Sequence, residues 1–178
     1  MYGVFRVLQS IVKTIAEFDL AQKKLQSILG ETAQGMKELT QSAIDLGKSS
    51  IFGAKGISEL QIELAKMGFT KNEIMAMQVA INDLAIATQE DLASSAEVVA
   101  NIIKTYQLTA TETRDVVNVM GKAFNDSALG LSNFREAIKY VAPVAKQAGL
   151  SFRETVAALE LLSNAGLKGS LAGTGLNN

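Results

Sequence analysis

The sequence is notable first for residues that it lacks. Among its 178 residues there is no cysteine and no histidine, and there is a single proline. Without cysteine the chain can form neither a disulfide framework nor a thiolate metal site. Without histidine it lacks the commonest general base and the commonest transition-metal ligand. We therefore expect no cofactor, no metal site and no catalytic residues.

Charge and hydropathy exclude two further classes of partner. The chain has 17 Lys and Arg residues against 18 Asp and Glu residues, so no strong overall field attracts nucleic acid or an acidic membrane surface. Its apolar runs are interrupted by polar residues before they reach the roughly 18 residues of a membrane-spanning helix. We expect neither sequence-specific nucleic-acid binding nor a membrane span in this segment.

What the sequence does contain is helix-forming residues and helix-capping motifs. Helix formers dominate, and no alternating run bounded by turn residues predicts a strand. In a capping box, a hydroxyl accepts a backbone N–H at the start of the helix and an acid three residues later reaches back to the cap. Gly68 and Gly149 precede two of these motifs and are expected in the left-handed conformation that ends a helix. The four predicted boxes or close variants are Thr70–Glu73, Thr88–Asp91, Thr109–Glu112 and Ser151–Glu154.

A weak repeat leaves two all-α arrangements open. An apolar residue followed by Thr or Ser and, three residues later, by Glu recurs at Phe69, Leu108 and Leu150. The spacing of about 40 residues equals two short helices with their turns, which is typical of a helical-hairpin array. The same capping chemistry also arises by convergence in an ordinary multi-helix bundle. The sequence therefore predicts an all-α fold that is either a bundle or a hairpin array.

The N-terminal segment carries a different pattern. Apolar residues recur there in alternating steps of four and three, with Gln22 as one polar residue in the seam and Gly30 as the end. This pattern predicts a long helix that either lies along the body of the domain or forms a self-associating coiled coil. Helices are expected next near residues 33–46 and 58–67, separated by the loop GKSSIFGAKG. The candidate self-association residues are Leu8, Ile11, Ile15, Phe18 and Leu25.

The domain organisation follows from these patterns. We expect a heptad-patterned helix over residues 1–30, a helical core domain over residues 31–168 and a glycine-rich flexible tail over residues 169–178. Gly47-Lys48-Ser49 resembles the end of a phosphate-binding loop, but Ser42 stands where the first glycine is required and no strand precedes it. Most acids lie in first helical turns, where they complement the helix dipole. None of these features supports an enzyme.

The single proline, Pro143, lies inside a predicted helix. Proline removes one helical donor and its ring crowds the carbonyl of Lys139, which costs about 3 kcal/mol when nothing compensates. A kink that lets the helix wrap around its neighbours would explain it. The alternative is a feature specific to a family.

The sequence around this proline resembles that of a known protein family. KYVAPVAKQAGLSFRETVAALELLSNAGLKGSLAGTGL closely resembles the core region of phage tail tape measure proteins, and ELAKMGFTKNEIM is similar to an earlier part of that region. The resemblance covers about residues 33–176. The residues that carry the family motif are Tyr140, Pro143, Gly149, Ser151, Glu154, Asn164, Gly166, Gly169 and Gly173.

The resemblance implies a structural, non-enzymatic protein of a phage or prophage tail. Members of this family are long helical chains that occupy the lumen of the tail tube and set tail length during assembly. The implied partners are tail tube proteins, tail tip proteins, assembly chaperones and further copies of the chain. The implied locations are the virion tail and, during assembly, the cytoplasm of the bacterial host. Family members are much longer, so we expect a fragment or a truncated copy; the alternative is a generic helical interaction scaffold unrelated to tails.

Helix geometry adds one expectation to the family resemblance. An uninterrupted helix rises about 1.5 Å per residue, so 178 residues would reach roughly 270 Å. Capping motifs instead interrupt this chain about every 20 residues. The sequence therefore predicts a folded module on a tape measure protein, with only the N-terminal helix able to extend into a rod.

Overall fold

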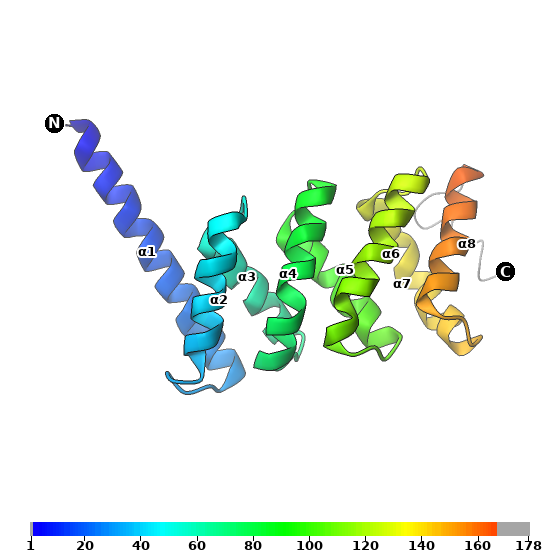
Figure 1. Ribbon diagram of the computed structural model, residues 1–178, viewed down its shortest axis with the longest axis horizontal. Coiled ribbons are helices and arrows are strands. Elements are labelled where there is room, and N and C mark those ends of the chain that lie inside the picture. The colour runs from blue at the N-terminus through cyan, green and yellow to red at the C-terminus, as the bar shows by residue number, and fades with distance from the viewer. Residues whose placement is uncertain (1, 167–178) are drawn as a thin grey trace. The chain divides into compact units, whose positions relative to one another are not determined.

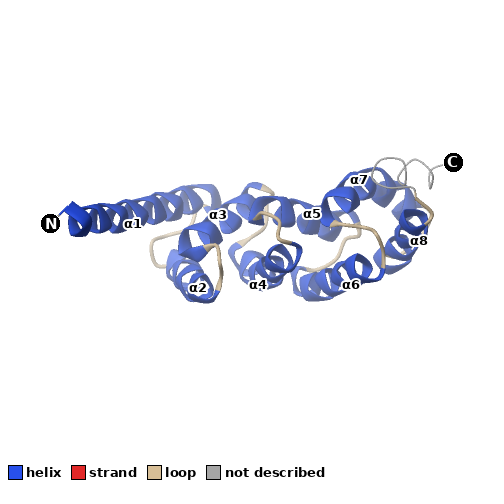
Figure 2. Cartoon of the chain, turned by 90° about the horizontal axis from the view of Figure 1, so that it is seen from above, coloured by secondary structure: helices blue, strands red, loops and turns tan. Residues whose placement is uncertain are grey.

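The computed structural model describes residues 2–166, and the side chains of residues 6, 9 and 11–166. Within this range the chain forms α-helices joined by short turns, with one 3-10 turn and no strand (Figure 2), which confirms the predicted all-α class. Most helices are shorter than 20 residues. Their bounds are α1 Tyr2–Leu29, α2 Met36–Ser49, α3 Gly53–Lys66, α4 Lys71–Thr88, α5 Leu92–Thr105, η1 Ala110–Glu112, α6 Thr113–Asp126, α7 Leu131–Gln147 and α8 Phe152–Asn164.

The chain divides into two compact units. Unit 1 comprises Met1–Val79 and unit 2 comprises Ala80–Asn178, so the boundary falls within α4. Each unit has its own apolar core, which in unit 1 includes Leu25, Leu39 and Leu64 and in unit 2 includes Met120 and Phe134, all with no exposed surface.

In unit 1, α1 and α2 both pack against α3. The polar residue of the N-terminal seam makes the link between these helices. The Gln22 side chain donates from Nε2 to the hydroxyl of Ser58 on α3 at 2.7 Å. Its Oε1 accepts from the hydroxyl of Thr40 on α2 at 2.8 Å. One amide therefore sets the position of α1 relative to both of its neighbours.

A second amide joins three helices in the core of unit 1. Gln61 on α3 is fully buried. Its Nε2 lies 3.1 Å from the backbone oxygen of Leu39, 3.1 Å from the hydroxyl of Ser42 and 2.8 Å from Oε1 of Gln78. Because an amide nitrogen has only two protons, these three acceptors share its donors. Unit 1 is therefore held by polar contacts as well as by apolar packing.

The turn between α2 and α3 differs from its sequence-based prediction. The third helix begins at Gly53 rather than near Ser58, and the expected loop GKSSIFGAKG is mostly helical. Glycine explains the difference, because the chain comes very close to itself here. A Cβ at Gly47 on α2 would lie 2.3 Å from the backbone nitrogen of Ala54 on α3. Only a residue without a side chain permits this approach.

Unit 2 packs its helices in two layers. α5 contacts α6 and α7, and α8 contacts α6 and α7. Figure 1 shows α6 and α8 side by side, with α7 behind them. α5 therefore packs on the two helices that follow it, and α8 packs on the two that precede it, which is the pattern of a helical-hairpin array. Within unit 2 the Phe124 and Phe134 rings meet edge to face, 5.5 Å apart, between α6 and α7.

Three of the four predicted capping boxes are confirmed. The backbone N–H groups of Thr70, Thr109 and Ser151 donate to Glu73, Glu112 and Glu154 at 2.7, 2.7 and 2.8 Å. The Thr109 box precedes the 3-10 turn η1, which leads directly into α6.

The prediction that Thr88 caps a helix is wrong. Thr88 is the last residue of α4, and its hydroxyl donates to the carbonyl of Leu84 at 2.8 Å. Gln89 adopts a left-handed φ of 58° and closes α4. The N-cap of α5 is Asp91, whose Oδ1 accepts from the backbone N–H of Ser94 at 2.8 Å. Aspartate is a stronger N-cap than threonine, and here it displaces the threonine box.

Two helical glycines provide a matched test of the α2–α3 contact. We expect Gly47→Ala to destabilise unit 1 by about 1–3 kcal/mol, since the new methyl group would force the two backbones apart. Gly121 is also inside a helix, α6, but a Cβ there meets nothing within 4 Å. Gly121→Ala should stabilise by about 0.5–1 kcal/mol through backbone entropy. Chemical denaturation followed by circular dichroism measures both, and an unchanged Gly47→Ala variant would contradict the close approach.

Candidate functional site

The family motif predicted from the sequence forms the junction between α7 and α8. Gly149 adopts a left-handed φ of 83° and ends α7, with the N–H of Leu150 donating back to the carbonyl of Ala145 at 2.9 Å. Ser151 then caps α8, and its hydroxyl accepts from the backbone N–H of Glu154 at 3.3 Å. These contacts satisfy the unpaired backbone groups of both helix ends. This part of the motif therefore has a structural role.

The junction is fixed to the rest of unit 2 through α5. The hydroxyl of Tyr106 donates to the hydroxyl of Thr155 on α8 at 2.8 Å. The rings of Tyr106 and Phe152 meet edge to face at 5.6 Å. Burial raises the pKa of Tyr106, while its hydrogen bond to Thr155 acts in the opposite direction. The start of α8 is therefore held against the end of α5.

The other motif residues lie mostly at the surface. Tyr140 is 50% exposed and Pro143 is exposed within α7, which continues through the proline to Gln147. Asn164 ends α8, and its Oδ1 accepts from the backbone N–H of Ala128 at 3.3 Å. Gly166 follows with φ of 91°. Gly169 and Gly173 lie outside the described residues.

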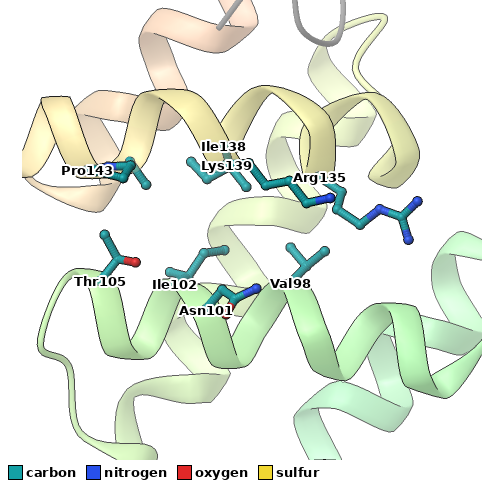
Figure 3. A pocket seen from close by; sticks show the side chains of 9 residues that line it. Val98, Asn101, Ile102, Thr105, Arg135, Ile138, Lys139 and Pro143 are labelled. Carbon is teal, nitrogen blue, oxygen red and sulfur yellow. The ribbon is translucent and has the colours of Figure 1, made fainter. Parts of the chain in front are cut away.

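A groove runs between α5 and α7 (Figure 3), with a volume of about 220 Å³. The side chains that line it come from both helices, and those of α7 include Pro143 of the family motif. The sequence gives no signal for this groove, because it depends on the pairing of two helices that are not consecutive. The lining residues are Val98, Asn101, Ile102, Thr105, Arg135, Ile138, Lys139, Ala142 and Pro143.

The candidate self-association residues of α1 fall into two groups. Ile11 and Ile15 are 49% and 55% exposed, whereas Leu25 is fully buried in unit 1. Phe18, which lies between them, is half-buried, and the side chain of Leu8 is outside the described set. Leu25 is therefore not available to a partner, because α3 covers this end of α1. Figure 1 shows the first half of α1 extending beyond α2 and α3.

An ion pair marks where α1 meets α3. Lys55 on α3 lies 3.0 Å from the carboxylate of Glu17. The hydrogen bond and the charge of Lys55 hold the pKa of Glu17 below its ordinary value. Before this point the helix contains bases but no acid, since Arg6 and Lys13 are its only charged residues up to Ala16. We call residues 2–16 the arm.

Two other kinds of site are absent from the part of the chain that the structure describes. Residues 2–166 contain no group of three acidic or other metal-ligating side chains placed to hold a metal ion. Over the same range, no helix combines the length and the apolar composition needed to cross a bilayer.

Comparison with known proteins identifies the family. Residues 40–178 match the family described as phage-related minor tail protein. The chain belongs to this family. It is therefore a structural component of a phage tail, and the predicted resemblance to tape measure proteins is confirmed.

Three relatives carry the name of tape measure protein. The chain is 38% identical to the tape measure protein of Pneumococcus phage Dp-1, over 93% of this chain and 14% of that protein. It is 30% identical to a probable tape measure protein of Escherichia phage P2, over 89% of this chain and 20% of the relative. A probable tape measure protein of Clostridium phage phiCD119 is 25% identical over 85% of the chain and 16% of its own length. The chain thus spans only a seventh to a fifth of these relatives, and no solved structure matches it.

The capping boxes predict acid sensitivity. Hydrogen bonds from the hydroxyl and the backbone N–H of Ser151 hold the pKa of Glu154 below its ordinary value of 4.5. A lowered pKa in the folded state stabilises the fold above pH 4.5, and this stabilisation is lost as the pH falls through the folded-state value. We expect the melting temperature to fall between about pH 6 and about pH 3. Glu154→Gln keeps the capping geometry without titrating, so its melting temperature should depend less on pH.

The left-handed end of α7 gives a second test. We expect Gly149→Ala to destabilise unit 2 by about 1–2 kcal/mol, because an alanine at φ of 83° is strained even though a Cβ there meets no atom within 4 Å. Gly130 is an equally open glycine just before α7, with φ of −94°. Gly130→Ala should change the free energy of unfolding much less. Equal melting temperatures for the two variants would show that Gly149 is not needed to end α7.

Proposed function

We propose that this chain is a folded helical module of a tape measure protein, the component that sets tail length from inside the tail tube. The observation that carries the proposal is the 38% identity to the tape measure protein of phage Dp-1 over 93% of the chain. The module contributes a fixed folded body to a much longer protein.

The lengths of the helices support a module rather than a ruler. Residues in an α-helix advance about 1.5 Å each, so the 28 residues of α1 span about 42 Å. No other α-helix among the described residues exceeds 18 residues, and short connections separate the helices from α2 to α8. Most of this segment therefore adds bulk to the protein and little length.

Because the chain belongs to a tail protein family, the proposal extends to its partners and its location. The partners that we propose are tail tube proteins, tail tip proteins and an assembly chaperone, with the chain in the host cytoplasm before it enters the tail. The role is structural and not enzymatic. The generic scaffold that the composition also allows is disfavoured, because all three named relatives are tape measure proteins or probable ones.

A second copy of the chain is the partner that we propose for the arm. Ile11 and Ile15 lie on one seam of α1 and are about half exposed, and the arm continues a helix whose other half is already anchored. Burying such a seam against an identical helix removes apolar surface from water without requiring a new fold. The arm therefore pairs copies while units 1 and 2 stay folded.

A chimeric phage tests the tape measure role. The matching part of the Dp-1 tape measure protein is replaced by the aligned residues of this chain, and tails are measured by electron microscopy. We expect tails of the parental length, because the replacement has nearly the same number of residues and the same fold. A control insert of equal length, built from unrelated helical sequence, should fail to assemble tails. Failure of the chimera, with the chimeric protein folded and abundant, would contradict the proposal.

The arm hypothesis has its own test in solution. We expect the double variant Ile11→Ser with Ile15→Ser to abolish concentration-dependent self-association, measured by light scattering. Val12→Ser is the matched control, since Val12 is 66% exposed but lies outside the seam. A monomeric unmodified chain at high concentration would show that the arm does not pair copies.

A further inference from the structure

The groove between α5 and α7 has an apolar floor. Val98, Ile102, Ile138 and Ala142 lie there, each with at most 4% of its surface exposed. The volume of about 220 Å³ is below the roughly 300–1,000 Å³ that is usual for pockets that enclose small molecules. A groove of this size between two parallel ridges is suited to one large apolar side chain presented by another helix.

The rim of the groove is basic. Arg135 and Lys139 project from α7 at its edge (Figure 3), and none of the residues that line it is acidic. α7 carries three bases, which are Arg135, Lys139 and Lys146, and a single acid, Glu136. In contrast, α5 and α6 each have equal numbers of acids and bases, and α8 has more acids than bases. Glu136 lies 3.7 Å from Arg135 Nε and 3.4 Å from Lys139 Nζ, so it offsets one of the two rim cations and leaves the rim with a net positive charge.

Arg135 has a donor without an acceptor. Its Nε is buried and makes no hydrogen bond, and the nearest carboxylate oxygen, Glu136 Oε1, is 3.7 Å away. Its Nη1 donates to the hydroxyl of Ser94 at 3.3 Å. Glu90 and Asp91 share an adjoining hollow with Arg135, but Asp91 already accepts from Ser94 as the cap of α5. A buried unpaired guanidinium donor is unusual. The Arg135 side chain as a whole is 33% exposed, so an incoming carboxylate can pair with the accessible part of its guanidinium group.

We propose that this groove is a docking site for an acidic amphipathic helix of a partner protein. One large apolar side chain of the partner fills the floor, and carboxylates beside it pair with Lys139 and Arg135. The arm of a second copy does not fit this description, because its only charges, Arg6 and Lys13, are positive and would be repelled. The site is thus distinct from the arm and does not depend on its pairing.

A designed peptide provides the probe. It has about 18 residues, leucines at positions i, i+4 and i+7, flanking glutamates and one tryptophan next to a leucine. Because the chain itself has no tryptophan, the fluorescence of the peptide reports burial directly. We expect saturable binding that weakens as salt is added. Peptides with lysine in place of glutamate, or alanine in place of leucine, should bind at least about tenfold more weakly.

Matched charge reversals locate the site on the chain. Lys139→Glu changes the rim of the groove and should weaken binding of the acidic peptide at least about tenfold. Lys37→Glu makes the same change in net charge on α2, at an exposed position, and should leave binding unchanged. Circular dichroism establishes that both variants are folded.

Several results would overturn the proposal. The proposal is wrong if the acidic peptide does not bind, if the acidic and basic peptides bind equally, or if the two charge reversals have equal effects on binding. Light scattering of the chain alone adds a fourth: if Lys139→Glu abolishes self-association, the occupant of the groove is a second copy of the chain. None of these results depends on whether the chimeric phage assembles tails.

Discussion

The unpaired backbone groups at helix ends constrain this fold more than any other feature. An α-helix leaves four N–H groups and four carbonyls without partners, and a chain of short helices repeats this cost at every turn. In this chain, nearby side chains pair with some of these groups. Glu73, Glu112 and Glu154 each accept a hydrogen bond from the backbone N–H of the residue that caps their helix. Because each helix starts and stops at a defined residue, its apolar face has a defined direction. The packing of both units depends on the direction of these apolar faces.

This constraint explains which parts of the fold could be predicted from the sequence. Capping is encoded within a few residues, so the boxes at Thr70, Thr109 and Ser151 and the left-handed turn at Gly149 were all predictable. The error at Thr88 is also local, since two residues three positions apart can each cap a helix and the stronger one, Asp91, does so.

Features that depend on distant residues were not predictable in this way. The glycines around Gly47 suggest a loop when read locally, but they serve a contact between two backbones. The groove beside Pro143 requires α5 and α7 to be neighbours, and no residue spacing within either helix indicates that pairing. Of the candidate residues, the sequence could place Ile11 and Leu25 on one seam. It could not show that the seam is exposed at one end and buried at the other.

Gln22 shows why that seam divides where it does. A polar residue in an apolar seam weakens a coiled coil but fixes its register. Here the amide of Gln22 is used within unit 1, where it is hydrogen-bonded to Ser58 and Thr40, so a shift of α1 along α3 would break both hydrogen bonds. The Glu17–Lys55 pair lies N-terminal to Gln22 and is half exposed, so it contributes little to stability. The same helix is therefore a fixed part of unit 1 after Glu17 and a projecting arm before it. A contact made by the arm reaches the core through a continuous helix, so pairing of two arms would also set the orientation of the units that carry them.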